Sequence, residues 1–168
     1  MRHLALIAAT ALLAGPTLAQ TAPETLHAVV NNTEGQEVGQ VTAVPTPSGV
    51  MHLTIILHDL PRGTHAVHIH ETGACTPDFG AAGGHLAGDK DHGIMAENGP
   101  HPGDLPNIHI PESGALSVEY FVTGLTADML MDADGSAFMI HEGADDYATQ
   151  PTGDAGGRLG CGVFAAQS

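Results

Sequence analysis

Positive charge is scarce in this sequence. Its 168 residues include four Lys or Arg against 19 Asp or Glu, and the formal net charge at pH 7 is −15. A protein that binds nucleic acid or an anionic membrane surface needs the opposite balance of charge. Strong acidity also occurs in disordered chains, but 42% of these residues are hydrophobic and they fall in patterned runs. The composition therefore predicts a folded domain that has neither nucleic acid nor a membrane as its partner.

Long apolar segments are missing as well. The longest apolar run, residues 4–13, follows a basic N-terminus and is too short to cross a bilayer. Pro16 ends the run, and Thr17-Leu18-Ala19 follows it as the expected cleavage site, with small residues at its two ends. This order is typical of a secretory signal peptide rather than of a first helix in the domain. We therefore predict a signal peptide over 1–19 and one exported domain over 20–168.

Cysteine is limited to Cys75 and Cys161. An even number of cysteines in an exported protein predicts disulfide bonding, because the compartment is oxidising. We expect one disulfide, Cys75–Cys161, which closes a long loop and restricts the unfolded chain.

Sustained helical periodicity is absent, whereas alternation with period two is frequent. In VMHLTIILHDL (residues 50–60), Met51, Leu53, Ile55 and Leu57 fall on one face of an extended chain. Turn-forming residues separate such runs, and the chain has 22 Gly and 11 Pro. The pattern predicts an all-β fold, an antiparallel β-barrel or sandwich. The expected strands lie at 26–30, 38–44, 51–57, 116–122, 137–140 and 162–164.

Two long segments, 72–107 and 142–160, lack this alternation and are rich in Gly, Pro and Asp. Loops of this length are usually functional or disordered. We expect both to be functional loops on the barrel.

Histidines are concentrated around the first of these loops. His68 and His70 lie two residues apart, so on a strand they point to the same face and can reach one ion. By itself this pair is a weak signal, and an exposed polar strand face is the better explanation of it. His65 falls on the opposite face, and we interpret it as structural or solvated, as we do His27, His52, His58 and His109.

The loop itself contains a second group of possible ligands. His85, His92, His101 and Asp104 lie within twenty residues, and three imidazoles with one carboxylate suit tetrahedral zinc. The alternative is a solvated acidic loop with incidental histidines. Further along the chain, His141 ends an apolar alternating run, and Arg158 lies three residues before Cys161.

Taken in order, these motifs resemble those of the copper/zinc superoxide dismutase family, in its bacterial exported form. The shared motifs are His-x-His-Glu, Gly-Cys, Gly-Gly-His, His-x-Gly-Asp-Leu-x-Asn, His-Glu-x-x-Asp-Asp and Gly-x-Arg-Leu-x-Cys-Gly-Val, and they cover essentially the whole predicted domain. The resemblance implies a Greek-key barrel of about eight strands, located in the periplasm. The sequence has no signature of oligomeric state, and a homodimer is left open.

The resemblance also implies one copper ion and one zinc ion per chain. His68, His70, His85 and His141 would bind copper, and His85, His92, His101 and Asp104 would bind zinc, so that His85 bridges the two metals. Asp145 matches a carboxylate that orients one histidine of each site. The loop after His85 departs from the family pattern, with Leu86-Ala87-Gly88 and a shorter path to His92, which leaves Asp89 or Asp91 as competing zinc ligands.

The implied reaction converts two superoxide ions and two protons to oxygen and hydrogen peroxide, with copper alternating between Cu(II) and Cu(I). Arg158 matches the arginine that docks superoxide beside copper, and the disulfide would hold its loop. A non-catalytic, exported copper- and zinc-binding protein on the same fold is the alternative. Arg158 discriminates between the two, because a metal store has no use for a cation that binds no metal.

Overall fold

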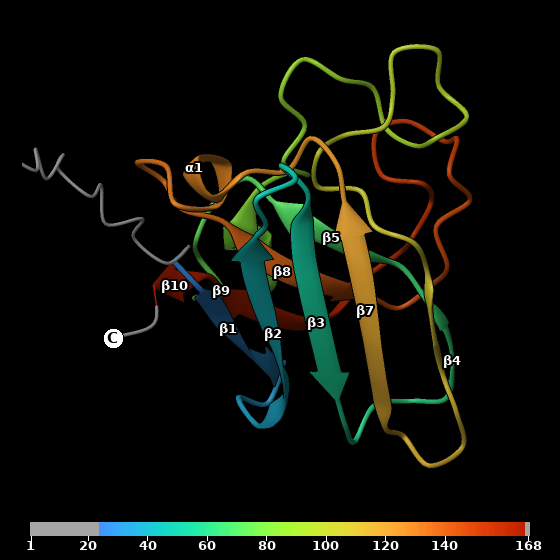
Figure 1. Ribbon diagram of the computed structural model, residues 1–168. Coiled ribbons are helices and arrows are strands. Elements are labelled where there is room, and N and C mark those ends of the chain that lie inside the picture. Colours follow the sequence, from blue (N-terminus) through green and yellow to red (C-terminus); the bar gives the residue numbers. More distant parts are fainter. Residues whose placement is uncertain (1–23, 167–168) are drawn as a thin grey trace, which may run out of the picture.

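The computed structural model describes residues 24–166, and strands account for most of its regular structure (Figure 1). The predicted signal peptide lies outside these residues. The strands within them are β1 (Leu26–Asn32), β2 (Glu37–Pro45), β3 (Met51–Leu57), β4 (Gly63–His65), β5 (Val67–His70), β6 (Ile108–Ile110), β7 (Leu116–Val122), β8 (Ala137–His141), β9 (Arg158–Val163) and β10 (Ala165–Ala166). No helix among these residues is long and apolar enough to cross a membrane.

The strands form an antiparallel, strongly curled sheet. Its order is β5-β8-β9-β1-β2-β3-β7, with β10 paired to β1, and β4 and β6 form a separate pair. Three successive strands, β1 to β3, are neighbours, while β9 returns by a long connection to lie beside β1. This is the Greek-key order of connection. The predicted fold class is confirmed.

Side-chain alternation places the core inside the curled sheet. On β3, Met51, Leu53, Ile55 and Leu57 are almost fully buried, whereas the residues between them reach solvent. Leucine, isoleucine and valine from β1, β2, β5, β6 and β8 complete the same cluster, together with Phe138. Burial of this apolar surface is the main favourable term for the fold.

Two strand predictions need correction. The last long strand, β9, begins at Arg158 rather than at residue 162, because Arg158 pairs with His141 at the end of the neighbouring strand β8. The second loop therefore ends at residue 157. The pair β4–β6 was not predicted, since three residues on each strand are too few to establish a period of two.

The two long loops lie together on one side of the barrel (Figure 1). The first contains a short 3₁₀ helix, Phe79–Ala82, and the one-turn helix α1 (Ala127–Leu130) belongs to a different connection. His92 in the first loop exchanges backbone hydrogen bonds with the side chain of Gln150 in the second. Cys75 and Cys161 form the predicted disulfide, which joins the first loop to β9.

Candidate metal centre

The short strand β5 organises the site through its backbone. Ile69 accepts a hydrogen bond from the amide of Leu86 at 2.7 Å and donates to the carbonyl of Gly103 at 2.8 Å. These bonds draw two distant parts of the first loop along the strand, so that His85 lies opposite His70 and Asp104 opposite His68. Gly103 allows this approach, because a Cβ there would lie 2.4 Å from the carbonyl oxygen of Ile69.

Four buried histidines meet beside this strand. His68 and His70 come from β5, His85 from the first loop and His141 from the end of β8, and one ring nitrogen of each lies within 4.8 Å of the others. Nδ1 of His68 and Nε2 of His85 are buried without a hydrogen-bond partner. Buried polar atoms are rarely left unpaired, so these unpaired nitrogens fit the role of metal ligands. Four imidazoles suit Cu(II).

A second group of ring nitrogens surrounds the carboxylate of Asp104. Its Oδ1 lies 3.0 Å from Nδ1 of His85, 3.0 Å from Nδ1 of His92 and 3.1 Å from Nδ1 of His101. The other oxygen, Oδ2, accepts hydrogen bonds from the amides of Gly93 and His101, which fixes the carboxylate. Three ring nitrogens around one carboxylate oxygen fit the ligand set of a tetrahedral zinc ion.

Proximity alone would also admit His68 to this second group, beside His85, His92 and Asp104. His101 is the better fourth member, because Nε2 of His68 already donates to Asp145 and its Nδ1 faces the four-histidine group. Asp89 and Asp91 are exposed and belong to neither group, while His92 is fully buried. The loop that departs from the family pattern therefore presents His92, and Leu86 packs into the main core.

Asp145 connects the two groups through one carboxylate. Its Oδ2 lies 2.8 Å from Nε2 of His68, and its Oδ1 lies 3.0 Å from Nε2 of His92. Burial raises the pKa of Asp145, but hydrogen bonds from His68 and from the amide of Tyr147 outweigh it and lower the pKa to about 2. The side chain therefore stays ionised and accepts a hydrogen bond from both rings.

Burial favours the uncharged form of His68, His70 and His141, as their lowered pKa values indicate. It lowers the pKa of His70 to about 2 and that of His141 to about 3 in the metal-free protein, and nearby histidines add to the effect. Burial also lowers the pKa of His68 and of His101. For Asp104, burial acts in the opposite direction, but hydrogen bonds from His85 and Gly93 hold its pKa below the ordinary value. Neutral imidazoles and an ionised carboxylate are the forms that bind metal.

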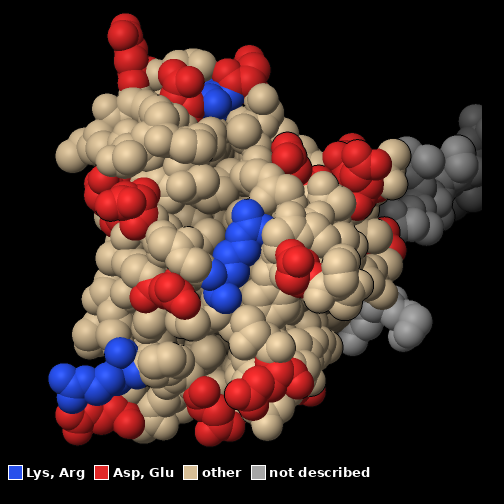
Figure 2. Space-filling model, turned by 180° about the vertical axis from the view of Figure 1, so that it is seen from behind, with Lys and Arg blue, Asp and Glu red and all other residues tan. Residues whose placement is uncertain are grey.

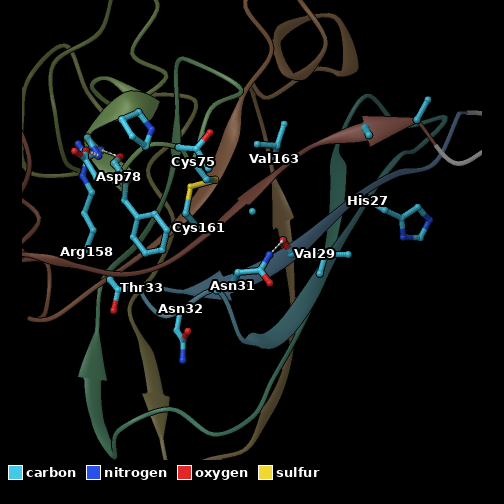
Figure 3. Close-up of a pocket in the computed structure, with 18 residues that line it drawn as sticks. His27, Val29, Asn31, Asn32, Thr33, Cys75, Asp78, Arg158, Cys161 and Val163 are labelled. Atoms are coloured by element: carbon cyan, nitrogen blue, oxygen red, sulfur yellow. Dashed lines mark hydrogen bonds between the residues drawn. A yellow bond between two sulfur atoms is a disulfide. The ribbon is translucent and has the colours of Figure 1, made fainter.

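Arg158 lies at the rim of the site, half-buried, at the start of β9. Its guanidinium donates to the carbonyl of Phe79, and its Nη2 donates to the carbonyl of Gly83 at 2.7 Å. Figure 3 shows Arg158 at one end of a groove of about 1000 Å³, with the Cys75–Cys161 disulfide in the groove wall. The disulfide thus fixes the loop whose carbonyls hold the guanidinium.

Acidic residues predominate among the charged side chains of this chain. Figure 2 shows carboxylates distributed over one face, with the basic side chains isolated from one another. Arg62 is engaged by Glu112, and Lys90 lies in the first loop near Asn98. Arg158 thus contributes its positive charge without a carboxylate bonded to it within residues 24–166.

The histidines predicted to lie outside the metal groups do so. His65 is buried, with Nδ1 2.9 Å from the carbonyl oxygen of His141 and Nε2 3.1 Å from that of Pro61, so it is structural. Two positioning groups escaped the sequence analysis: the carbonyl of Gly83 and the side chain of Asn107. The Gly83 carbonyl has no sequence signal, because every residue has one, whereas Asn107 was visible as the last residue of a quoted motif.

Comparison with known proteins agrees with this geometry. A family model described as "Copper/zinc superoxide dismutase (SODC)" matches residues 37–164. A superoxide dismutase [Cu-Zn] of Caulobacter vibrioides is 42% identical over 146 residues, which cover 82% of this chain and 83% of the relative. Among solved structures, a SOD-like protein from Bacillus subtilis is 36% identical with a TM-score of 0.77, covering 82% of this chain and 96% of that one. The Cu/Zn superoxide dismutase from Brucella abortus is 29% identical with a TM-score of 0.71, covering 83% and 99%.

Proposed function

Since the chain belongs to the copper/zinc superoxide dismutase family, we propose that it dismutes superoxide at a copper ion that shares His85 with a zinc ion. The enzyme class and the two cofactors follow from the family match and from relatives named as superoxide dismutases. The proposal assigns the ligands. Copper would be held by His68, His70, His85 and His141, and zinc by His85, His92, His101 and Asp104.

The environments of the two ring nitrogens of His85 are the main support for this proposal. Nδ1 lies 3.0 Å from Asp104 Oδ1 within the group that suits zinc. Nε2 is buried, lacks a partner and faces the four-histidine group. A single imidazole can offer one nitrogen to each of two ions once both N–H protons are gone. No other described residue presents one ring nitrogen to each group without a competing hydrogen bond.

Copper, when bound, supplies the one-electron redox chemistry that superoxide dismutation needs. The protein's part is proton transfer and orientation. Nε2 of His85 would hold a proton in one half of the cycle and release it toward the departing peroxide in the other. The contact between Nδ1 and the zinc group would keep the ring in place throughout. His68 is held by Asp145 and His70 by the carbonyl of Gly83, so both rings keep fixed orientations.

Arg158 would dock the anionic substrate. Its guanidinium donates to the backbone carbonyls of Phe79 and Gly83, which fixes the guanidinium plane beside the proposed copper group. Arg offers five donors and keeps its charge at working pH, so an anion can still be bound. Two divalent ions and Arg158 outweigh the local carboxylate charge, and a cleft focuses that local field even though the whole molecule is acidic.

Export completes the proposal. A signal peptide over 1–19 would deliver the domain 20–168 to the periplasm, where the Cys75–Cys161 disulfide can form. A homodimer is compatible with this location and is testable by sedimentation of the metal-loaded protein.

Reconstitution tests the shared ligand. Metal-free protein is titrated with Cu²⁺ and Zn²⁺ and followed by elemental analysis, Cu(II) electron paramagnetic resonance and a superoxide assay. We expect one ion of each per chain, and His85→Ala should change the copper signal, weaken zinc binding and lower activity. His109→Ala is the matched control, because His109 is exposed and outside both groups. An unchanged copper signal and zinc affinity in His85→Ala would overturn the bridging assignment, and a metal-loaded but inactive wild type would favour a metal-binding protein.

A further inference from the structure

Asn107 joins the two long loops through three hydrogen bonds. Its side-chain Nδ2 donates to the carbonyl of Asp145 at 2.9 Å, and its Oδ1 accepts from the amide of Asp145 at 2.8 Å. Its own amide donates to the hydroxyl of Tyr147 at 2.7 Å. Asn107 ends the first loop, and β6 begins at the next residue, whereas Asp145 and Tyr147 belong to the second loop.

Asp145, whose backbone Asn107 binds, is tightly constrained in position. The Asp145 side chain is fully buried, and its two oxygens bond rings from different metal groups, His68 and His92. Its Oδ1 also accepts from the amide of Tyr147 at 2.7 Å. Gly153 packs directly against it, since a Cβ there would lie 1.8 Å from Asp145 Oδ1. A shift of the Asp145 backbone would therefore move the carboxylate away from at least one ring.

We propose that Asn107 is a positioning residue for both metal groups: its two-point hold on the Asp145 backbone sets the carboxylate that orients His68 and His92. This inference rests on the proposed function, because it takes those rings as copper and zinc ligands. Asn107 touches neither ring and acts through Asp145. Partners that orient metal ligands change metal affinity when they are removed, so the role has a measurable consequence.

Asparagine is the side chain that this position requires. These two hydrogen bonds require one donor for the Asp145 carbonyl and one acceptor for the Asp145 amide, both on a short planar side chain. Leucine of similar size provides neither. Aspartate keeps the acceptor but places a second oxygen against the carbonyl of Asp145.

The test measures zinc affinity rather than activity. Zn²⁺ is competed from the copper-loaded protein with a chelator of known affinity, for the wild type, Asn107→Leu and Asn98→Leu. Asn98→Leu is the matched control, because Asn98 lies in the same loop and is exposed, and among residues 24–166 its side chain bonds Lys90 and Asp89 alone. Asn107→Leu should raise the Zn²⁺ dissociation constant on the order of tenfold or more and alter the Cu(II) resonance. Asn98→Leu should change neither.

A double-mutant cycle separates positioning from a general effect on folding. In the Asp145→Ala background the carboxylate is absent, so Asn107→Leu should add little further loss of zinc affinity. An equal loss in that background, or an unchanged affinity and resonance in Asn107→Leu, would overturn the proposal. If Asn107→Leu does not fold, Asn107→Asp is measured in the same way against the same criteria. The His85→Ala response is recorded in parallel, so that failure of the bridging site is distinguished from failure of the Asn107 role.

Discussion

Arg158 and His70 donate to the same acceptor, the carbonyl oxygen of Gly83. The distances are 2.7 Å from Nη2 of Arg158 and 3.0 Å from Nδ1 of His70. One carbonyl in the disulfide-linked loop thereby fixes both the guanidinium at the rim and one ring of the four-histidine group. The proposed anion site and the proposed copper site therefore share one backbone acceptor.

This arrangement predicts the effect of removing the guanidinium. Arg158→Ala should retain copper and zinc yet lower superoxide turnover on the order of tenfold or more, because a charge-assisted hydrogen bond contributes about 1.5–3 kcal/mol. Arg158→Lys keeps the positive charge but lacks the paired N–H donors of the guanidinium, so its turnover should lie between those of Arg158→Ala and the wild type. Wild-type activity should also decrease as ionic strength rises. Arg62→Ala is the control, since Arg62 pairs with Glu112 at the surface. Full activity in copper-loaded Arg158→Ala would remove the docking role.

The disulfide should matter for both stability and activity. A variant with Cys75→Ser and Cys161→Ser loses the cross-link between the first loop and β9, which typically costs about 2–5 kcal/mol. We expect a lower denaturant midpoint, and lower activity at equal copper content because the Phe79 and Gly83 carbonyls are no longer anchored. Mass spectrometry of the exported wild type should show a gain of two hydrogens on reduction. Free thiols in that protein, or an unchanged midpoint in the variant, would contradict the assignment.

Gly153 offers a steric test with an internal control. Gly153 and Gly49 both have positive φ, +68° and +80°, so alanine carries a similar backbone cost at each, about 1–2 kcal/mol. A Cβ at Gly49 meets nothing within 4 Å, whereas a Cβ at Gly153 would lie 1.8 Å from Asp145 Oδ1 and 2.6 Å from His92 Nε2. Gly153→Ala should therefore weaken zinc binding strongly while Gly49→Ala leaves it intact. Equal zinc affinities in the two variants would refute the tight packing around Asp145.

The metal-free protein should lose stability in mild acid. In the folded state the pKa of His70 is lowered to about 2 and that of His141 to about 3, whereas the ordinary value is 6.5. The unfolded chain therefore binds protons that the folded chain does not, so the free energy of unfolding falls as pH drops from about 6.5 toward 3. Urea unfolding at several pH values would measure this slope, and His70→Gln should reduce it. A slope that is flat across this window would show that the rings are not buried in neutral form.

Asp145 acts at a lower pH. Its folded pKa of about 2 lies below the ordinary 3.8, so its contribution is fully present above about 4 and is lost as pH falls through 2. The histidines and this carboxylate therefore give two separate acid windows.

The sequence was most informative where residues of one chemical type recur at the two-residue spacing of a β-strand. Alternation alone located β3 and its buried face, and the two-residue spacing of His68 and His70 placed both rings on one side of β5. The ligand groups were predictable because histidine is a common metal ligand and the histidines are concentrated around the first long loop. The resemblance to a family then ordered them into two sites.

What the sequence did not reveal depends on backbone groups and short elements. Gly83 contributes a carbonyl, and Ile69 holds the first loop through its amide and carbonyl, which no residue type signals. The short strands β4 and β6 pair only because the chain around them is folded. Arg158 was expected in a loop, whereas its pairing with His141 makes it the first residue of β9.

The shared ring of His85 is the central claim, and crystallography of the metal-loaded protein tests it most directly. Anomalous diffraction recorded on either side of the copper and zinc absorption edges would locate each element independently. The account predicts copper at Nε2 of His85, among His68, His70 and His141, and zinc at Nδ1, among His92, His101 and Asp104. Copper and zinc peaks that do not both lie on His85, or a single metal bound among all these residues, would contradict it.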